Sequence, residues 1–212
     1  MIEHVFPTPI GFYDYTKRIT QTELDFFDNL KFVANRNNSI SECRTLLDYK
    51  EMKRLRVFFN KCLSDYLVKT IAPPDSVRHY ITHCWMNRTD IGESHHLHSH
   101  QNSIVSGVFY LKTVKDRDTI TFHKVNQNII EPYAQVYNEY NCHDFSYEAK
   151  EMQLILFPST LPHSVRPISG DTDTRVSISF NTFVTGSIDS AVGRHPDGSD
   201  AGYINIPIID YG

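Results

Sequence analysis

A cluster of histidines in the middle of the chain is the part of the sequence best suited to chemistry. Four of the eleven histidines fall within residues 95–100, which read HHLHSH. Alternate side chains of a strand share a face, so His96, His98 and His100 are predicted to point the same way. Two imidazoles at positions i and i+2 can bind one metal ion. We expect His98 and His100 to be metal ligands, His96 to contact the substrate or support the ligands, and His95 to be exposed. The alternative is a solvated polar face at a strand end.

A third ligand is expected from the segment MQLILFPSTLPHSVRP at residues 152–167. An apolar strand ends there at Pro158, and a short turn leads through Pro162 to His163. Because each proline fixes its own φ, the two prolines make a rigid mount for the histidine. Three ligands would leave open positions on the metal for other molecules.

An arginine within the next expected strand is the main candidate for binding an anion. Arg175 and Ser177 stand two residues apart in RVSISF, so they share a face. A guanidinium among apolar and hydroxyl residues is costly unless it meets an anion, and its planar fork suits a carboxylate. An ordinary ion pair with one of the chain's 25 acidic residues is the alternative.

The elements that must hold these residues change character along the chain. Three- and four-residue spacing of apolar residues predicts helices over 22–34, with a capping residue at the start, and over 50–71, ended by the prolines of 72–75. Short segments rich in β-branched and aromatic residues then predict strands over 76–87, 103–112, 118–124, 152–158 and 175–184. No helix alternates with these strands, so we expect an antiparallel sandwich or barrel preceded by helices.

This pattern predicts a single domain over residues 1–212. We expect an N-terminal helical region at 1–75 that packs on a β core at 76–185. The core carries a polar insertion at 125–150, and a C-terminal extension follows at 186–212.

Composition excludes several classes of protein. With 25 acidic and 21 basic residues the net charge is −4, and no basic face for nucleic acid is expected. No apolar run is long enough for a membrane helix, and the first residues lack a signal peptide, so a cytoplasmic protein is expected. The four cysteines form no CxxC pair and are expected to be reduced thiols.

Taken together, four segments resemble a known family: FPTPI, HSHQNSIVSGVFYL, LFPSTLPHSV and RVSISFN, which span residues 6–181. They are similar to the 2-oxoglutarate and Fe(II)-dependent oxygenases of bacteria and bacteriophages. This resemblance implies a double-stranded β-helix core of the jelly-roll or cupin-like type. It also implies that His98 and His163 bind iron, that Arg175 with Ser177 binds the distal carboxylate of 2-oxoglutarate, and that Tyr110 contacts the same carboxylate.

The chain departs from the family at position 100. Most such oxygenases have an acid two residues after the first histidine, and here His98-Ser99-His100 has an imidazole. His100 as a ligand is one interpretation. Water, or a carboxylate such as Asp90 or Glu93, in the third place is the other.

The activity implied by the resemblance is hydroxylation of a C–H bond with molecular oxygen, releasing succinate and CO2. The substrate would be a small molecule or a protein that the sequence does not identify, and assembly as a homodimer stays open.

Two alternatives use the same three histidines. One is a cupin-type metalloprotein, because Gly92 followed by His98-x-His100 and the spacing from Pro158 to His163 match cupin motifs. Against it, Ile104 and Val105 stand where a glutamate is expected. The other is a β-helix domain that binds a metal or a ligand without turnover.

Overall fold

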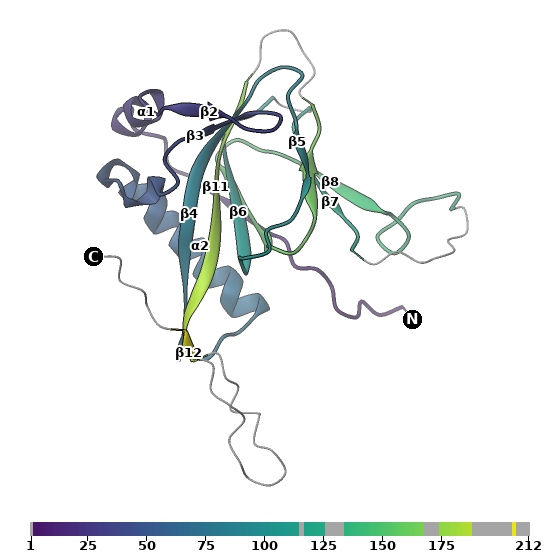
Figure 1. The fold of residues 1–212 in the computed structure, drawn as a ribbon. Helices are drawn as coiled ribbons and strands as arrows, with labels where there is room; N and C mark the ends of the chain where they lie inside the picture. Colours follow the sequence, from purple (N-terminus) through teal and green to yellow (C-terminus); the bar gives the residue numbers. More distant parts are fainter. Residues whose placement is uncertain (1, 115–116, 126–133, 168–173, 188–204, 207–212) are drawn as a thin grey trace.

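Two antiparallel β-sheets that face each other form the body of the protein (Figure 1). The structure is a computed structural model and describes residues 2–114, 117–125, 134–167, 174–187 and 205–206. The large sheet has the order β1-β9-β6-β11-β4-β3-β2, with β12 added to β11. Its strands are β1 (Gly11–Asp14), β2 (Phe32–Ala34), β3 (Ser39–Ser41), β4 (Val77–Thr89), β6 (Val105–Lys112), β9 (Gln153–Pro158), β11 (Arg175–Ser187) and β12 (Asn205–Ile206).

The small sheet has the order β5-β10-β7-β8. Its strands are β5 (His95–His98), β7 (Thr119–His123), β8 (Asp144–Glu148) and β10 (His163–Val165). From β4 to β11 the chain passes from one sheet to the other at every step except the β7–β8 hairpin. This alternation winds the chain into a double-stranded β-helix and confirms the expected mainly β fold with N-terminal helices.

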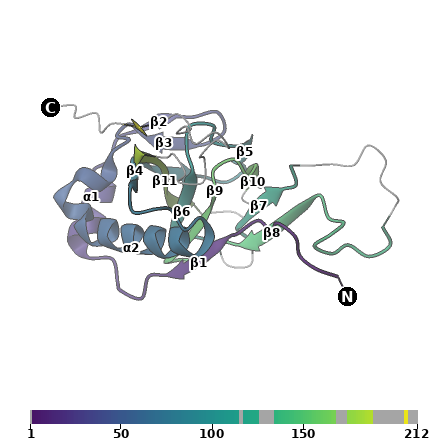
Figure 2. The ribbon, with the colours of Figure 1, turned by 90° about the horizontal axis from the view of Figure 1, so that it is seen from below.

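Helices cover the face of the large sheet that points away from the small sheet (Figures 1 and 2). They are α1 (Gln21–Asp28) and α2 (Lys53–Thr70), with the short 3₁₀ turns η1 (Leu46–Asp48) and η2 (Lys50–Met52) between them. Most of the apolar positions expected on the second helix are buried, including Leu55, Phe59 and Leu63. The helix ends at Thr70, just before the prolines that were expected to end it.

The strands of the large sheet separate two apolar cores by alternation. On β11, Ile178 and Phe180 face the helices, and Phe180 stacks on Phe59 of α2 at 5.3 Å between ring centroids. The opposite face of the same strand carries Arg175 and Ser177 into the space between the sheets. The site therefore lies on the inner face of a sheet whose outer face is fixed by packing.

The N-terminal region differs from the expected helical one. The first helix begins after Thr20, whose side chain forms a capping box with Glu23, and it ends at Asp28 rather than at Ala34. Phe32–Ala34 forms β2, because it pairs with β3 at the edge of the large sheet. Local apolar spacing indicated a longer helix, and tertiary strand pairing overrode it.

The expected strands of the core are all present, and two more were missed, β8 and the short β10 that begins at His163. The polar insertion contains β8, which pairs with β7 over five residues, because Thr121, Phe122 and their neighbours need a partner on that side of the sheet. Residues 126–133 lie outside the described part. All four cysteines are free. No helix among the described residues is long and apolar enough to cross a membrane.

Candidate metal centre

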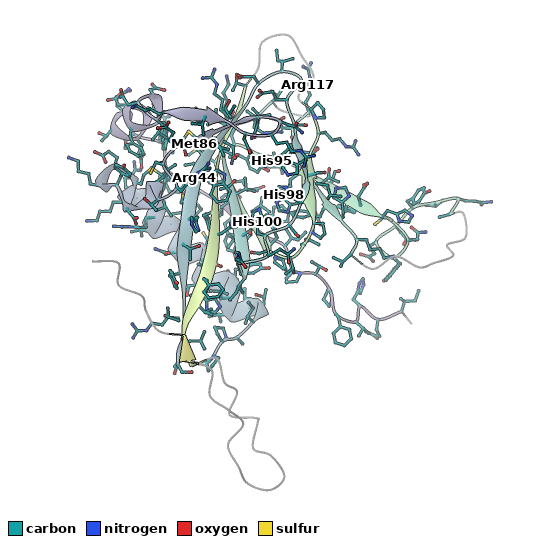
Figure 3. The ribbon with its side chains drawn as sticks, in the orientation of Figure 1. Arg44, Met86, His95, His98, His100 and Arg117 are labelled. Carbon is teal, nitrogen blue, oxygen red and sulfur yellow. The ribbon has the colours of Figure 1, made fainter. Side chains whose placement is uncertain are left out.

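Three histidines from two neighbouring strands meet between the sheets. His98 ends β5, His163 begins β10, and the two residues are paired across the strands. His100 follows β5 directly. One ring nitrogen from each of the three lies within 4.8 Å of the others. Figure 3 shows His95, His98 and His100 on the side of β5 that faces the large sheet.

Backbone carbonyls fix the orientation of two of these rings. Nδ1 of His98 lies 2.8 Å from the carbonyl oxygen of His96, and Nδ1 of His163 lies 3.0 Å from that of Leu161. A carbonyl oxygen only accepts hydrogen bonds, so both Nδ1 atoms carry the proton. Nε2 of each ring therefore keeps its lone pair for a metal ion.

The third ring is held by side chains of the large sheet. Nδ1 of His100 lies 2.5 Å from Oδ1 of Asn181 and 2.9 Å from Oγ of Ser106. Ser106 also donates to Oδ1 of Asn181 and contacts Ser159, so the amide oxygen accepts from both sides. His100 is thus oriented as firmly as the other two, although it lies outside a strand.

Burial keeps these imidazoles in the form that binds metal. It lowers the pKa of His163 to about 3, with a further contribution from the nearby His98. Burial also lowers the pKa of His98 and of His100, against the opposing effect of their hydrogen-bond acceptors. Neutral imidazoles need not release a proton when a metal ion binds.

The carboxylates considered for the third place are engaged elsewhere. Asp90 accepts a hydrogen bond from Thr174 at 2.7 Å and pairs with Arg88 at 3.5 Å. Glu93 accepts from the backbone N–H of Asp90. Within the described ranges, His98, His100 and His163 are the one group of histidine, cysteine or acidic side chains whose ligand atoms converge on a common point. The geometry favours His100 over either acid.

A cavity between the sheets joins the three histidines to the other predicted residues. Its walls include Arg175, Ser177 and Tyr110, which therefore lie in one space with the metal ligands. Trp85, the only tryptophan, also lines the cavity, and its ring lies 6.3 Å from that of His100.

Arg175 has a partner that sequence reasoning missed. Nη1 of Arg175 lies 3.1 Å from Oδ1 of Asp118, and the two side chains are only 4% and 2% exposed. Oδ2 of Asp118 accepts the backbone N–H of Val114. Arg175 therefore forms the ordinary ion pair that was the alternative from the sequence, and it also lines the cavity.

Hydroxyl and amide groups surround the arginine. Nδ2 of Asn87 donates to Oγ of Ser177 at 3.4 Å and to Oγ of Ser179 at 2.8 Å. Burial raises the pKa of Tyr110 well above its ordinary value, so its phenol keeps its proton. The cavity wall near Arg175 can donate several hydrogen bonds to an anion.

His95 and His96 differ from the prediction in which of the two rings lines the cavity. His95 is half-buried and lines the cavity, and its ring stacks on that of His98 at 4.7 Å between ring centroids and 19°. His96 is not among the lining residues, and its backbone carbonyl rather than its ring supports His98. The expected exposure of His95 is therefore wrong. The physical reason is an irregularity in β5, where strict alternation was assumed.

Sequence reasoning also missed Asp118, Asn181 and Ser106. Asn181 could have been found, because it continues the alternation that places Arg175 and Ser177 on one face. For Asp118 the sequence holds no local signal that separates it from the other acidic residues.

The site combines a group that can bind a metal ion with a group that can bind an anion. Three neutral nitrogen donors can hold a divalent transition metal while leaving coordination positions open. An arginine with neighbouring hydroxyls in the same cavity can hold the carboxylate of a small acid. A molecule with a carboxylate at one end and a metal-binding group at the other could span both.

Comparison with known proteins agrees with this geometry. Residues 83–181 match the model of a family described as "Putative 2OG-Fe(II) oxygenase", where 2OG is 2-oxoglutarate. The matched segment contains the three histidines, Tyr110 and Arg175. No curated protein sequence matches the chain.

Solved structures share the fold at low sequence identity. HygX from Streptomyces hygroscopicus, crystallised with nickel and 2-oxoglutarate, is 12% identical, with a TM-score of 0.57 over 94% of this chain and 93% of HygX. A prolyl-4-hydroxylase from Pseudomonas putida is 11% identical, with a TM-score of 0.54 over 82% of this chain and 92% of that one. A prolyl hydroxylase from Trichoplax adhaerens is 14% identical, with a TM-score of 0.54 over 82% and 83%. These likenesses show the double-stranded β-helix fold, and the segment of residues 83–181 is similar to the 2OG-Fe(II) oxygenase family.

Proposed function

We propose that this protein is an Fe(II)- and 2-oxoglutarate-dependent oxygenase. It hydroxylates a C–H bond of a small-molecule or protein substrate and releases succinate and CO2. The observation that carries the proposal is that one cavity holds both the three converging imidazoles and Arg175.

The donor set fits the metal. Imidazole nitrogen is a suitable ligand for iron, as it is for nickel, copper and zinc. His98, His100 and His163 would hold the ion, and their Nδ1 hydrogen bonds point the Nε2 lone pairs toward it. Three neutral ligands leave the double positive charge of Fe(II) to be balanced by a dianion such as 2-oxoglutarate.

The other cavity residues would hold the 2-oxo acid. Arg175, kept in place by Asp118, binds its distal carboxylate, and Ser177 and the protonated Tyr110 donate hydrogen bonds to the same group. When bound, the iron and the 2-oxo acid supply the oxygen chemistry that side chains cannot perform.

The chain itself contributes orientation and a dry environment. The cavity wall includes Val108, Ile120 and Phe157, which belong to the apolar core between the sheets. Water excluded by this wall cannot compete for the hydrogen bonds of the acid, so these bonds are stronger than they would be at the surface.

The ion pair of Arg175 with Asp118 favours the alternative function. A guanidinium already neutralised by a buried carboxylate needs no second anion, as in a cupin-type or non-catalytic metal-binding protein. In that case the three histidines bind metal and the cavity binds no 2-oxo acid.

Succinate formation tests the proposal. The protein is supplied with Fe(II), 2-oxoglutarate and oxygen in the presence of pooled metabolites and peptides, and succinate is measured. We expect succinate from the wild type and from His83→Ala, an exposed histidine outside the cavity, but none from His163→Ala. A wild type that binds Mn(II) but neither binds nor consumes 2-oxoglutarate would establish the alternative.

A further inference from the structure

An irregular pairing of β5 with β10 turns an additional histidine into the cavity. From His163 to Val165 β10 advances two residues, and over the same distance β5 advances three, from His98 to His95. The extra residue is a β-bulge, which re-aims side chains and is frequent beside active sites. In a regular strand His95 would point away from His98. With the bulge, both face the large sheet (Figure 3).

His95 lies in the cavity beside both the metal ligands and Arg175. It lines the same space as Arg175 and the metal ligands, and its ring lies against that of His98. The 2-oxo acid of the proposed function must reach from the metal ligands to Arg175, so it must pass this ring.

The cavity is smaller than the pockets that usually hold small molecules. Its volume is about 40 Å³, whereas pockets that hold small molecules usually measure roughly 300–1,000 Å³. Most other lining residues belong to central strands of the large sheet, which are fixed on both sides. His95 belongs to β5, an edge strand of the small sheet beside the exposed Leu97. The part of the cavity wall that can move to admit a ligand is therefore β5, which carries His95.

We propose that His95 is a specificity-determining residue, which contacts the 2-oxo acid and restricts the acids that fit between the metal ligands and Arg175. This inference rests on the proposed function. The imidazole donates or accepts one hydrogen bond with the bound acid, and its ring limits the width of the space beside the acid.

Binding measurements test this inference without turnover. The protein is loaded with Mn(II) under anaerobic conditions and titrated with 2-oxoglutarate and, separately, with the branched 3-methyl-2-oxoglutarate. Quenching of Trp85 reports binding, since this single tryptophan lines the cavity.

Two substitutions separate the hydrogen bond from the bulk of the ring. His95→Phe keeps a ring of similar width and removes hydrogen bonding, so the Kd for 2-oxoglutarate should rise about tenfold, the usual effect of one hydrogen bond to a charged group. His95→Ala removes the ring from the cavity wall and makes room beside the acid. The Kd for the branched acid, divided by the Kd for 2-oxoglutarate, should therefore fall about tenfold. His83→Ala, at an exposed histidine of β4 outside the cavity, should change neither value.

The outcomes are distinct. If His95→Phe and His95→Ala fold, bind Mn(II) like the wild type and keep its two Kd values, the role of His95 is refuted and the oxygenase proposal stands. If the wild type binds Mn(II) but neither acid, both proposals fail. A variant that only misfolds loses Mn(II) affinity. Misfolding alone would not change the ratio of the Kd values for the two acids.

Discussion

The buried pair of Arg175 and Asp118 allows one prediction to be worked out in energy. Asp118→Asn keeps the shape of the side chain and removes its charge. The variant amide has one oxygen for two donors, Nη1 of Arg175 and the backbone N–H of Val114, so one donor loses its acceptor. The guanidinium then lies in a nearly inaccessible site without a counter-charge.

Breaking a buried pair by removing one partner costs about 3–5 kcal/mol. We expect the free energy of unfolding of the metal-free protein to fall by that amount, a large part of the roughly 5–15 kcal/mol that holds a domain folded. Urea denaturation followed by circular dichroism measures it. The matched control is Asp90→Asn, which breaks a pair with Arg88 whose side chains are 51% and 55% exposed. Exposed pairs contribute about 0–1 kcal/mol, so the control should lose little.

A double substitution completes the test. Asp118→Leu combined with Arg175→Met replaces the pair with apolar groups of similar size, and it should recover most of the stability lost in Asp118→Asn. If Asp118→Asn loses no more than Asp90→Asn, the buried charge of Arg175 does not depend on Asp118, and the reasoning about this pair is refuted.

Three further predictions concern the metal centre. His163→Ala should lower Mn(II) affinity in a calorimetric titration by more than about 100-fold, because losing a ligand costs more than losing a residue that only orients one. His83→Ala should leave the affinity unchanged. Equal Mn(II) affinities of His163→Ala and the wild type would exclude His163 as a ligand. Asn181→Leu removes the acceptor that orients His100, so Mn(II) affinity should fall about 10- to 100-fold, and an unchanged affinity would show that Asn181 does not orient the ring. The lowered pKa of His163, about 3 against an ordinary 6.5, means that the metal-free folded state binds fewer protons than the unfolded state between these values. Stability is therefore complete above pH 6.5 and falls as the pH drops, by about 2 kcal/mol at pH 5 from this residue; urea midpoints that are equal at pH 7 and pH 5 for the metal-free wild type would contradict this.

Much of the core could be read from residue spacing. The period of two in the strands and of three to four in the second helix reflects burial of one face, and burial is what forms these elements. The end of the first helix could not be read in this way, because Phe32–Ala34 becomes a strand only through its pairing with β3. Pairing between distant segments leaves no local pattern in the sequence.

The site shows the same limit in finer detail. Alternation along β11 placed Arg175 and Ser177 together because that strand is regular over these residues. The same rule failed at His95, because the bulge in β5 depends on its register with β10. Asp118 is one acid among 25, and only the folded chain brings it to the guanidinium.

The surroundings of His100 fit an imidazole better than the acid that is usual at this position. Oδ1 of Asn181 accepts from both Ser106 and Nδ1 of His100, so the surroundings of this residue are built for a hydrogen-bond donor. An aspartate at this position would bring its carboxylate oxygens toward the same amide oxygen and would have no proton to donate. The aspartate would also be shorter, so it would not reach the point where the rings of His98 and His163 converge without moving the chain between Ser99 and Gln101. The backbone N–H of His100 donates to the carbonyl oxygen of Ser159, which fixes that chain. The neutral third ligand and the asparagine of β11 therefore form one unit, and a change at either residue alone should disturb the metal centre.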